Sequence, residues 1–255
     1  MSDHIERPSY QDLIYEDRLV AFVDILGWSA AVQSSGAAGA GELGWVVVLL
    51  QDLEREAQAH AHFASAIPPE VPWPGPTRGT VVTQFSDSVV ISLPADDPTA
   101  AWTIDQYLSL LCSRACQSGF LVRGGVTRGL IYHRQRIVYG PALIDAYQLE
   151  QRAVWPRIVS SPNLFEGTSR GWRIDSADGR TFFDYLTSFH VLPTQYRQLI
   201  CHGLITATEQ RILDKYLWAK NYFSLVIGDD PANGCIAVAI EIDGQLLGVP
   251  AGKWP

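Results

Sequence analysis

Two short segments of the sequence place an aspartate where a metal ion could be bound. Asp24 closes the apolar run RLVAFVDI at residues 18–25, which predicts a buried strand, and Gly27 follows it in a turn. Asp87 lies at the centre of GTVVTQFSDSVVISL at residues 79–93, whose two β-rich runs predict a hairpin. Taken alone, each aspartate is more simply explained as a helix cap or a turn residue.

The two aspartates gain a chemical meaning as a pair. We expect strand 18–25 and hairpin 79–93 to be neighbours in one sheet, which brings both carboxylates to one edge. Neighbouring carboxylates repel each other unless cations lie between them. Hard divalent ions that bridge the acids to phosphates meet that need, and the backbone of the glycine turn could approach phosphate oxygens.

The elements that would position these residues alternate between strand and helix. The order strand, helix, hairpin, helix, strand, helix, strand predicts one α/β sheet covered on one face by helices. Further predicted helices are at about 42–66, 98–117, 141–153 and 195–224, and further strands at 120–131, 156–161, 236–243 and 245–249. With no internal repeat or linker, we expect a single domain over 1–255, with a motif-bearing core at about 18–160 and a C-terminal elaboration at about 161–255.

Composition narrows the class of partner. The chain has 255 residues, 47% of them hydrophobic, and a net charge of -8. An acidic surface argues against nucleic acid or an anionic membrane as the main partner, but not against a nucleotide held through metal ions. No apolar run approaches the roughly 20 residues of a membrane span, and no signal core is evident. We therefore expect a cytoplasmic protein whose four cysteines are buried, reduced thiols.

Four segments, in order, resemble the class III adenylate and guanylate cyclases. FVDILGWS at 22–29 is similar to their first metal-binding segment, and FSDSVVISL at 85–93 to their second metal hairpin. VRGGVTRG at 122–129 resembles the strand that follows, and YGPALIDAYQLE at 139–150 resembles the next helix. The resemblance covers residues 20 to about 160. It implies a cyclase-like α/β (α+β) fold, a mixed, mainly antiparallel sheet with helices packed on it.

The resemblance also implies the roles of individual residues. Two magnesium or manganese ions would be bound by Asp24, Asp87 and the carbonyl of Ile25. The triphosphate would be held by the backbone of Leu26, Gly27, Trp28 and Ser29.

The sequence departs from the purine cyclases at the positions that read the base and orient the ribose. Thr83 and Ile137 stand at base-reading positions, and Ile144 and Gln148 replace the ribose-orienting asparagine and the transition-state arginine. Losing such hydrogen bonds changes specificity by orders of magnitude, so adenine specificity is doubtful.

Other residues could take over these roles. Thr83 and Phe85 share one face of the first hairpin strand and could contact the base, although ordinary half-buried sheet residues would look the same. Arg123 could supply the transition-state cation, or it could form a surface or dimer salt bridge.

The chain resembles most the pyrimidine cyclases of bacterial Pycsar anti-phage systems. This implies a uridylate cyclase that converts UTP to cyclic UMP for a separate cyclic-nucleotide-sensing effector, working as a head-to-tail homodimer with shared active sites. A late Lys-Tyr-Leu-Trp helix at 215–218 also resembles that branch. The alternatives are a cytidylate cyclase, a purine cyclase of unusual specificity, and a cyclase-fold module that binds nucleotide without turnover.

Overall fold

The fold is built around one mixed sheet. The computed structural model describes residues 14–35, 77, 79–165, 171–187 and 193–228, together with the isolated positions 44, 48, 51 and 55. The eight strands are β1 (Glu16–Leu26), β2 (Val81–Phe85), β3 (Ser88–Pro94), β4 (Leu121–Arg134), β5 (Ile137–Tyr139), β6 (Ile158–Ser160), β7 (Trp172–Ile174) and β8 (Thr181–Phe183). Their order is β2-β3-β1-β4-β6-β8-β7, with β5 paired to β4.

Antiparallel pairing dominates this sheet. Only β4 and β6 run parallel among the described strands, and they are joined through helix α4 (Pro141–Ala153). A crossover helix is the usual connection between parallel neighbours. The expected mixed, mainly antiparallel sheet with packed helices is confirmed.

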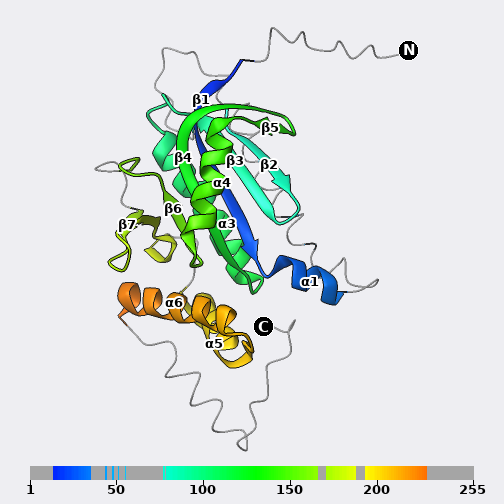
Figure 1. Ribbon diagram of the computed structural model, residues 1–255, viewed down its shortest axis with the longest axis vertical. Helices are drawn as coiled ribbons and strands as arrows, with labels where there is room; N and C mark the ends of the chain where they lie inside the picture. Colours follow the sequence, from blue (N-terminus) through cyan, green and yellow to red (C-terminus); the bar gives the residue numbers. More distant parts are fainter. Residues whose placement is uncertain are drawn as a thin grey trace, which may run out of the picture.

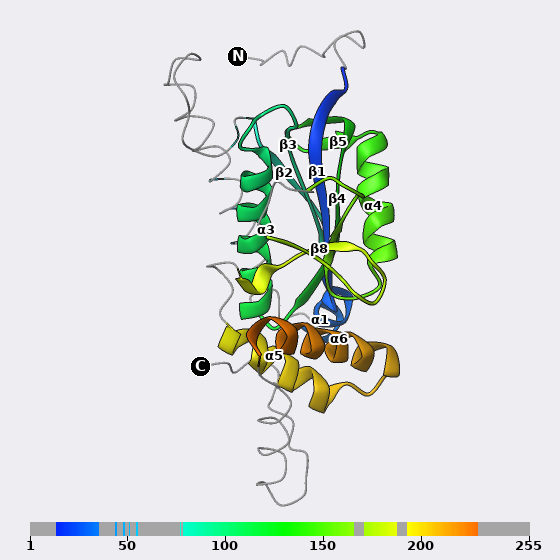
Figure 2. The ribbon, with the colours of Figure 1, turned by 90° about the vertical axis from the view of Figure 1, so that its left-hand side faces the viewer.

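Helices cover both faces of the sheet, so the prediction of one covered face is wrong. Figure 2 shows helix α3 (Ala100–Gln117) and α4 on opposite sides of the strands. The alternation of β1 explains this arrangement, because successive side chains point to opposite faces. Ala21 packs in the core that includes Leu108 of α3, whereas Val20 packs in a second core with Ala146 of α4.

Two glycines of β4 let α4 lie very close to the sheet. A Cβ atom at Gly125 would overlap the carbonyl oxygen of Ala146 and lie 2.5 Å from the Cβ of Leu149. At Gly129 it would lie 3.3 Å from the Cβ of Ala142. Packing this close leaves little room for α4 to shift against β4, which fixes the side chains of its last turns over the sheet.

The C-terminal part of the described chain forms a helical pair. The predicted helix 195–224 is two helices, α5 (Pro193–Thr206) and α6 (Gln210–Ile227), broken at residues 207–209. Figures 1 and 2 both place this pair across the end of the sheet where β1 ends and α1 (Trp28–Ser35) begins. A short 3-10 helix, η3 (Tyr185–Thr187), precedes it.

Buried contacts anchor α6 to the sheet. The guanidinium of Arg157, next to β6, is fully buried and pairs with Asp175 and Asp178. It also lies 5.9 Å from the ring of Trp218 on α6, whose indole nitrogen is 3.3 Å from Asp175. Trp218, in the middle of α6, therefore holds this helix in place next to β6.

Several sequence expectations concern other parts of the chain. Of the predicted helix 42–66, positions 44, 48, 51 and 55 are helical and the remainder lies outside the described residues, as do both late strands. Cys112 and Cys116 are buried free thiols, as expected. Cys201 is disulfide-bonded, so the expectation of a reduced thiol is wrong there. Among the described helices, none is long and apolar enough to cross a membrane.

Candidate functional site

Four side chains form a row across the sheet at the end of β1. In the strand register, Phe85 faces Ser88, Ser88 faces Asp24, and Asp24 faces Arg123. Directly opposed residues of antiparallel strands project from the same face. Phe22, two residues before Asp24, packs against Tyr147 of α4 with ring centroids 5.5 Å apart, so this row lies on the α4 face.

The second aspartate is held beside this row by the backbone. Ser86 and Asp87 form the two-residue turn between β2 and β3, and Ser86 has a positive φ of 54°. The amide of Ile25 donates a 2.9 Å hydrogen bond to the carbonyl oxygen of Asp87. This hydrogen bond brings together Asp24 and Asp87, which are 63 positions apart in the chain, as the sequence predicts.

Asp24 lies in an environment that disfavours its charge. Burial, followed by the negative charges of Asp87 and Glu150, raises the pKa of Asp24 to about 6. The charge of Arg123 and a 3.3 Å hydrogen bond from the Ser88 hydroxyl oppose that rise. The positive charge near the two carboxylates does not outweigh their repulsion and burial. A divalent cation stabilises such an arrangement.

Arg123 is already paired within its own chain. Its guanidinium forms an ion pair with Glu150 of α4, whose side chain is 1% exposed against 19% for Arg123. Glu150 also accepts a 2.6 Å hydrogen bond from the amide of Gln151. Arg123 does lie next to Asp24, and its role as a transition-state cation stays a prediction.

Lys215 is a second cation at this end of the sheet. It lies on α6, three residues before Trp218, so both project from neighbouring positions on one side of the helix. Its pKa is lowered, first by burial and then by the positive charges of Arg123 and Arg211, while the charges of Asp24 and Glu150 act in the opposite direction. Lys215 therefore shares the electrostatic environment of the paired aspartates.

Neither Glu150 nor Lys215 stands out in the sequence as a site residue. Glu150 lies in the second half of α4, and its ion-pair partner is 27 positions earlier in the chain. Lys215 belongs to the Lys-Tyr-Leu-Trp segment noted in the sequence, but that segment does not assign the lysine to the site. The tertiary packing of α4 and α6 brings both residues to the paired aspartates.

The predicted phosphate-binding turn has the expected backbone. Gly27 adopts a φ of +86°, a conformation that glycine tolerates best, and α1 starts at the next residue. Gly27 and Ser29 are exposed, whereas Leu26 and Trp28 pack partly against the main core. The turn thus presents backbone beside Asp24, and its contact with a triphosphate stays a prediction.

Thr83 and Phe85 lie on one strand but differ in environment. Thr83 is 4% exposed, donates to the carbonyl of Gln135 at 2.9 Å and is 2.8 Å from Nε2 of His133. Its hydroxyl is thus already hydrogen-bonded within the chain. Phe85 is 44% exposed and belongs to the row with Asp24, which makes it the better placed of the two for a base.

The paired aspartates fit a metal site that substrate completes. Among the described residues, no group of three or more histidines, cysteines, aspartates or glutamates could enclose an ion. Magnesium is commonly held by one or two carboxylates together with phosphates and water. Asp24 and Asp87, with the Ile25 carbonyl as predicted, would supply the protein ligands.

Comparison with known proteins gives remote likenesses. No protein-family model and no curated protein matches the sequence. The solved structure of the guanylyl cyclase Cya2 is similar over 66% of this chain and 91% of its own, with 14% identity and a TM-score of 0.42. The guanylate cyclase domain of RhGC from Catenaria anguillulae in complex with GTP is similar over 66% of this chain and 94% of its own, with 15% identity and a TM-score of 0.39.

A third similar structure is a class III adenylyl cyclase-like ATP-binding protein from Pseudomonas aeruginosa. The likeness covers 67% of this chain but 38% of that longer one, with 12% identity and a TM-score of 0.45. Likenesses of this strength leave the activity of the chain to be argued from its own residues.

Proposed function

We propose that this chain is a metal-dependent nucleotidyl cyclase of the class III type, converting UTP to cyclic UMP and pyrophosphate. The observation that carries the proposal is the meeting of Asp24 and Asp87 at the end of β1, beside the glycine turn at Gly27. A protein that packs two repelling carboxylates next to a phosphate-accessible backbone pays for that arrangement in stability unless it binds cations there.

The reaction joins two groups of one substrate. The ribose 3′-oxygen forms a bond to the α-phosphorus, the bond from that phosphorus to the pyrophosphate oxygen breaks, and the hydroxyl proton passes to water. Divalent ions bound at Asp24 and Asp87 would lower the pKa of the 3′-hydroxyl and neutralise the leaving pyrophosphate. The protein's own part is positioning and charge stabilisation.

Lys215 is the residue we assign to the charge of the phosphates. Gln148 stands where the resemblance expects a transition-state arginine, and it is exposed on α4. Arg123 is engaged by Glu150, whereas Lys215 on helix α6 lies within reach of the negative charge of Asp24. A fixed ammonium in a half-buried site stabilises phosphate charge more strongly than it would in water.

A homodimer with shared sites is part of the proposal. Apolar side chains are exposed on the outer side of α4 and on β5, with 57% exposure for Ile144, 48% for Tyr147 and 59% for Ile137. Contiguous exposed apolar side chains mark interaction surfaces. By the resemblance, a second copy docked on them would bring Ile144 and Gln148, at the positions of the ribose-orienting asparagine and the transition-state arginine, near the partner's nucleotide.

The cellular role we propose is anti-phage signalling of the Pycsar kind. Its support is the resemblance of the four motif segments together with the altered base-reading positions Thr83 and Ile137. Cyclic UMP would act on a separate cyclic-nucleotide-sensing effector. Cyclic CMP production from CTP is the nearest alternative.

Product analysis tests the activity. The purified chain is incubated with manganese and each of the four ribonucleoside triphosphates, alongside Asp87→Ala and the matched surface control Asp96→Asn. Cyclic UMP that is formed by the wild type and the control but not by Asp87→Ala supports the proposal. Cyclic AMP or cyclic GMP would overturn the pyrimidine specificity. Nucleotide binding without any product would favour a binding module instead.

A further inference from the structure

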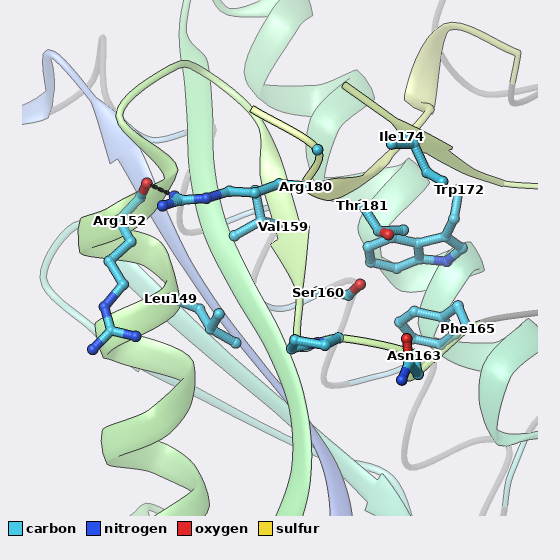
Figure 3. A pocket seen from close by; sticks show the side chains of 12 residues that line it. Leu149, Arg152, Val159, Ser160, Asn163, Phe165, Trp172, Ile174, Arg180 and Thr181 are labelled. Atoms are coloured by element: carbon cyan, nitrogen blue, oxygen red, sulfur yellow. Dashed lines mark hydrogen bonds between the residues drawn. The ribbon is translucent and has the colours of Figure 1, made fainter. Parts of the chain in front are cut away.

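A pocket beside the last turn of α4 is separate from the site of the paired aspartates. It has a volume of about 580 Å³ and lies among the end of α4, β6 and the β7–β8 hairpin (Figure 3). That volume falls within the range of small-molecule sites, roughly 300–1,000 Å³. Neither Asp24 nor Asp87 lines it.

The walls of the pocket combine apolar surface with cationic and neutral polar groups. Leu149, Val159 and Ile174 provide apolar side chains, and Trp172 contributes an indole that stacks on Phe165 with centroids 4.1 Å apart. Arg152 and Arg180 are the charged residues among the described lining residues, and none of those is acidic. Such walls suit a flat apolar body with one negative group.

Arg180 lies across one side of the pocket. Figure 3 shows its side chain reaching from the β7–β8 hairpin to α4, where it donates a hydrogen bond to the carbonyl oxygen of Arg152. Its Nε is 3.6 Å from Asp178, but the carboxylate of Asp178 is also paired with Arg157. Arg180 thus presents its guanidinium at the pocket, with N–H groups other than the one that donates to the carbonyl of Arg152.

Ser160 leaves a polar group unsatisfied in the same place. Its side chain is 7% exposed, and its hydroxyl has no hydrogen-bond partner within the part of the chain that the structure describes. Figure 3 shows the hydroxyl oxygen directed toward the side of the pocket where Trp172 lies. A buried hydroxyl without a partner costs free energy, which a ligand with a matching polar group would recover.

We infer that this pocket binds a planar ring carrying a single anionic group, the chemistry shared by nucleoside monophosphates and cyclic nucleotides. The ring would lie against Trp172 and the apolar side chains, and the anion would face Arg180. The pocket does not depend on the proposed function; only the cyclic product as one source of the ligand rests on it.

The position of the pocket connects it to the paired aspartates. Leu149 lines the pocket and is adjacent to Glu150, which holds Arg123 beside Asp24. Because Leu149 and Glu150 are consecutive residues of one tightly packed helix, an occupant that contacts Leu149 acts on the ion pair between Glu150 and Arg123. Binding in the pocket therefore changes the rate of the reaction at Asp24.

Calorimetry with three probes tests the binding. The full chain carrying Asp87→Asn, without metal, is titrated with cyclic UMP, UMP and uridine, so that nucleotide binding through metal ions does not contribute. At least one of the two anions is expected to bind, and neutral uridine more weakly than that anion. Binding of cyclic UMP alone points to the product as the source, and binding of UMP to the nucleotide pool. Binding of neither anion, or equal binding of uridine, overturns the inference.

A matched pair of substitutions at Ile174 locates the site. Ile174 is 72% exposed, so both Ile174→Glu and Ile174→Lys should leave folding intact. The added carboxylate should weaken anion binding by about fivefold and the added ammonium strengthen it by a similar factor. Equal affinities in both variants would place the ligand elsewhere. In the otherwise wild-type enzyme, the bound anion should change the initial rate, and Ile174→Glu should reduce that response; an unchanged rate refutes the coupling.

Discussion

Arg123 and Glu150 form an ion pair between β4 and α4, next to the position where Asp24 faces Arg123 in the β1–β4 register. Glu150 is 1% exposed, and this guanidinium is its ion-pair partner away from water. The pair has two consequences. It holds α4 over the sheet, and it places a negative charge that raises the pKa of Asp24 beside the positive charge that lowers it.

Breaking this ion pair should cost stability. Arg123→Met leaves the buried carboxylate of Glu150 unpaired, and the free energy of unfolding should fall by roughly 3–5 kcal/mol. In the double variant Arg123→Met, Glu150→Met, no charge is left unpaired, so much of the loss should be recovered. Urea denaturation of Arg123→Met, Glu150→Met and the double variant measures the coupling. Strictly additive losses would mean that the two side chains stabilise the fold independently.

Lys215 should be needed for turnover and dispensable for folding. Lys215→Met removes the ammonium that we assign to the phosphates, so kcat should fall by roughly 100-fold, with a smaller change in KM. Lys215→Arg keeps the charge and should recover most of the activity. Lys220→Met, on the same helix, is the matched control. If Lys215→Met and Lys220→Met have equal rates in a chain that is otherwise active, Lys215 has no role in the chemistry.

The sequence predicts the parts of this site that depend on local pattern. The sequence predicts the strand before Asp24, the hairpin around Asp87 and the helix beginning at Pro141, because strand alternation and proline placement are local signals. The opposite placement of α3 and α4 was not predicted, since it depends on which face of β4 carries Gly125 and Gly129. The three-residue strands β7 and β8 are too short for a periodic signal.

His133 should make the fold sensitive to acid. It is 3% exposed and lies 2.8 Å from both Ser92 and Thr83, while burial and then the charge of Arg18 lower its pKa to about 4. The unfolded chain therefore binds a proton more readily than the folded one. The stability that His133 contributes is present above its unfolded pKa of about 6.5 and is lost as the pH falls toward 4.

Urea unfolding between pH 7 and pH 4.5 measures this effect against His133→Gln, which does not titrate. The wild type should lose as much as about 3 kcal/mol more than the variant over that range. Parallel pH dependences for the two proteins would show that burial and the charge of Arg18 do not hold the histidine neutral.

Asp24 should give the opposite pH dependence in the metal-free protein. Its pKa is raised to about 6 by burial, by Asp87 and by Glu150, so the folded chain binds the proton more tightly than the unfolded chain. The stability from this group is present below its unfolded pKa and is lost as the pH rises through about 6. Asp24→Asn should remove that loss, with thermal unfolding at pH 5 and pH 7.5 as the measurement.

Manganese should reverse this loss, because a cation favours the ionised carboxylate that burial disfavours. Together with a triphosphate, the ion should raise the unfolding temperature of the wild type more at pH 7.5 than at pH 5, since protons compete for Asp24 at the lower pH. Asp24→Asn and Asp87→Asn should each show a much smaller rise, and Asp96→Asn should behave as the wild type. A rise that is equal at both pH values, or that survives in the two site variants, would mean that the metal binds elsewhere on the chain.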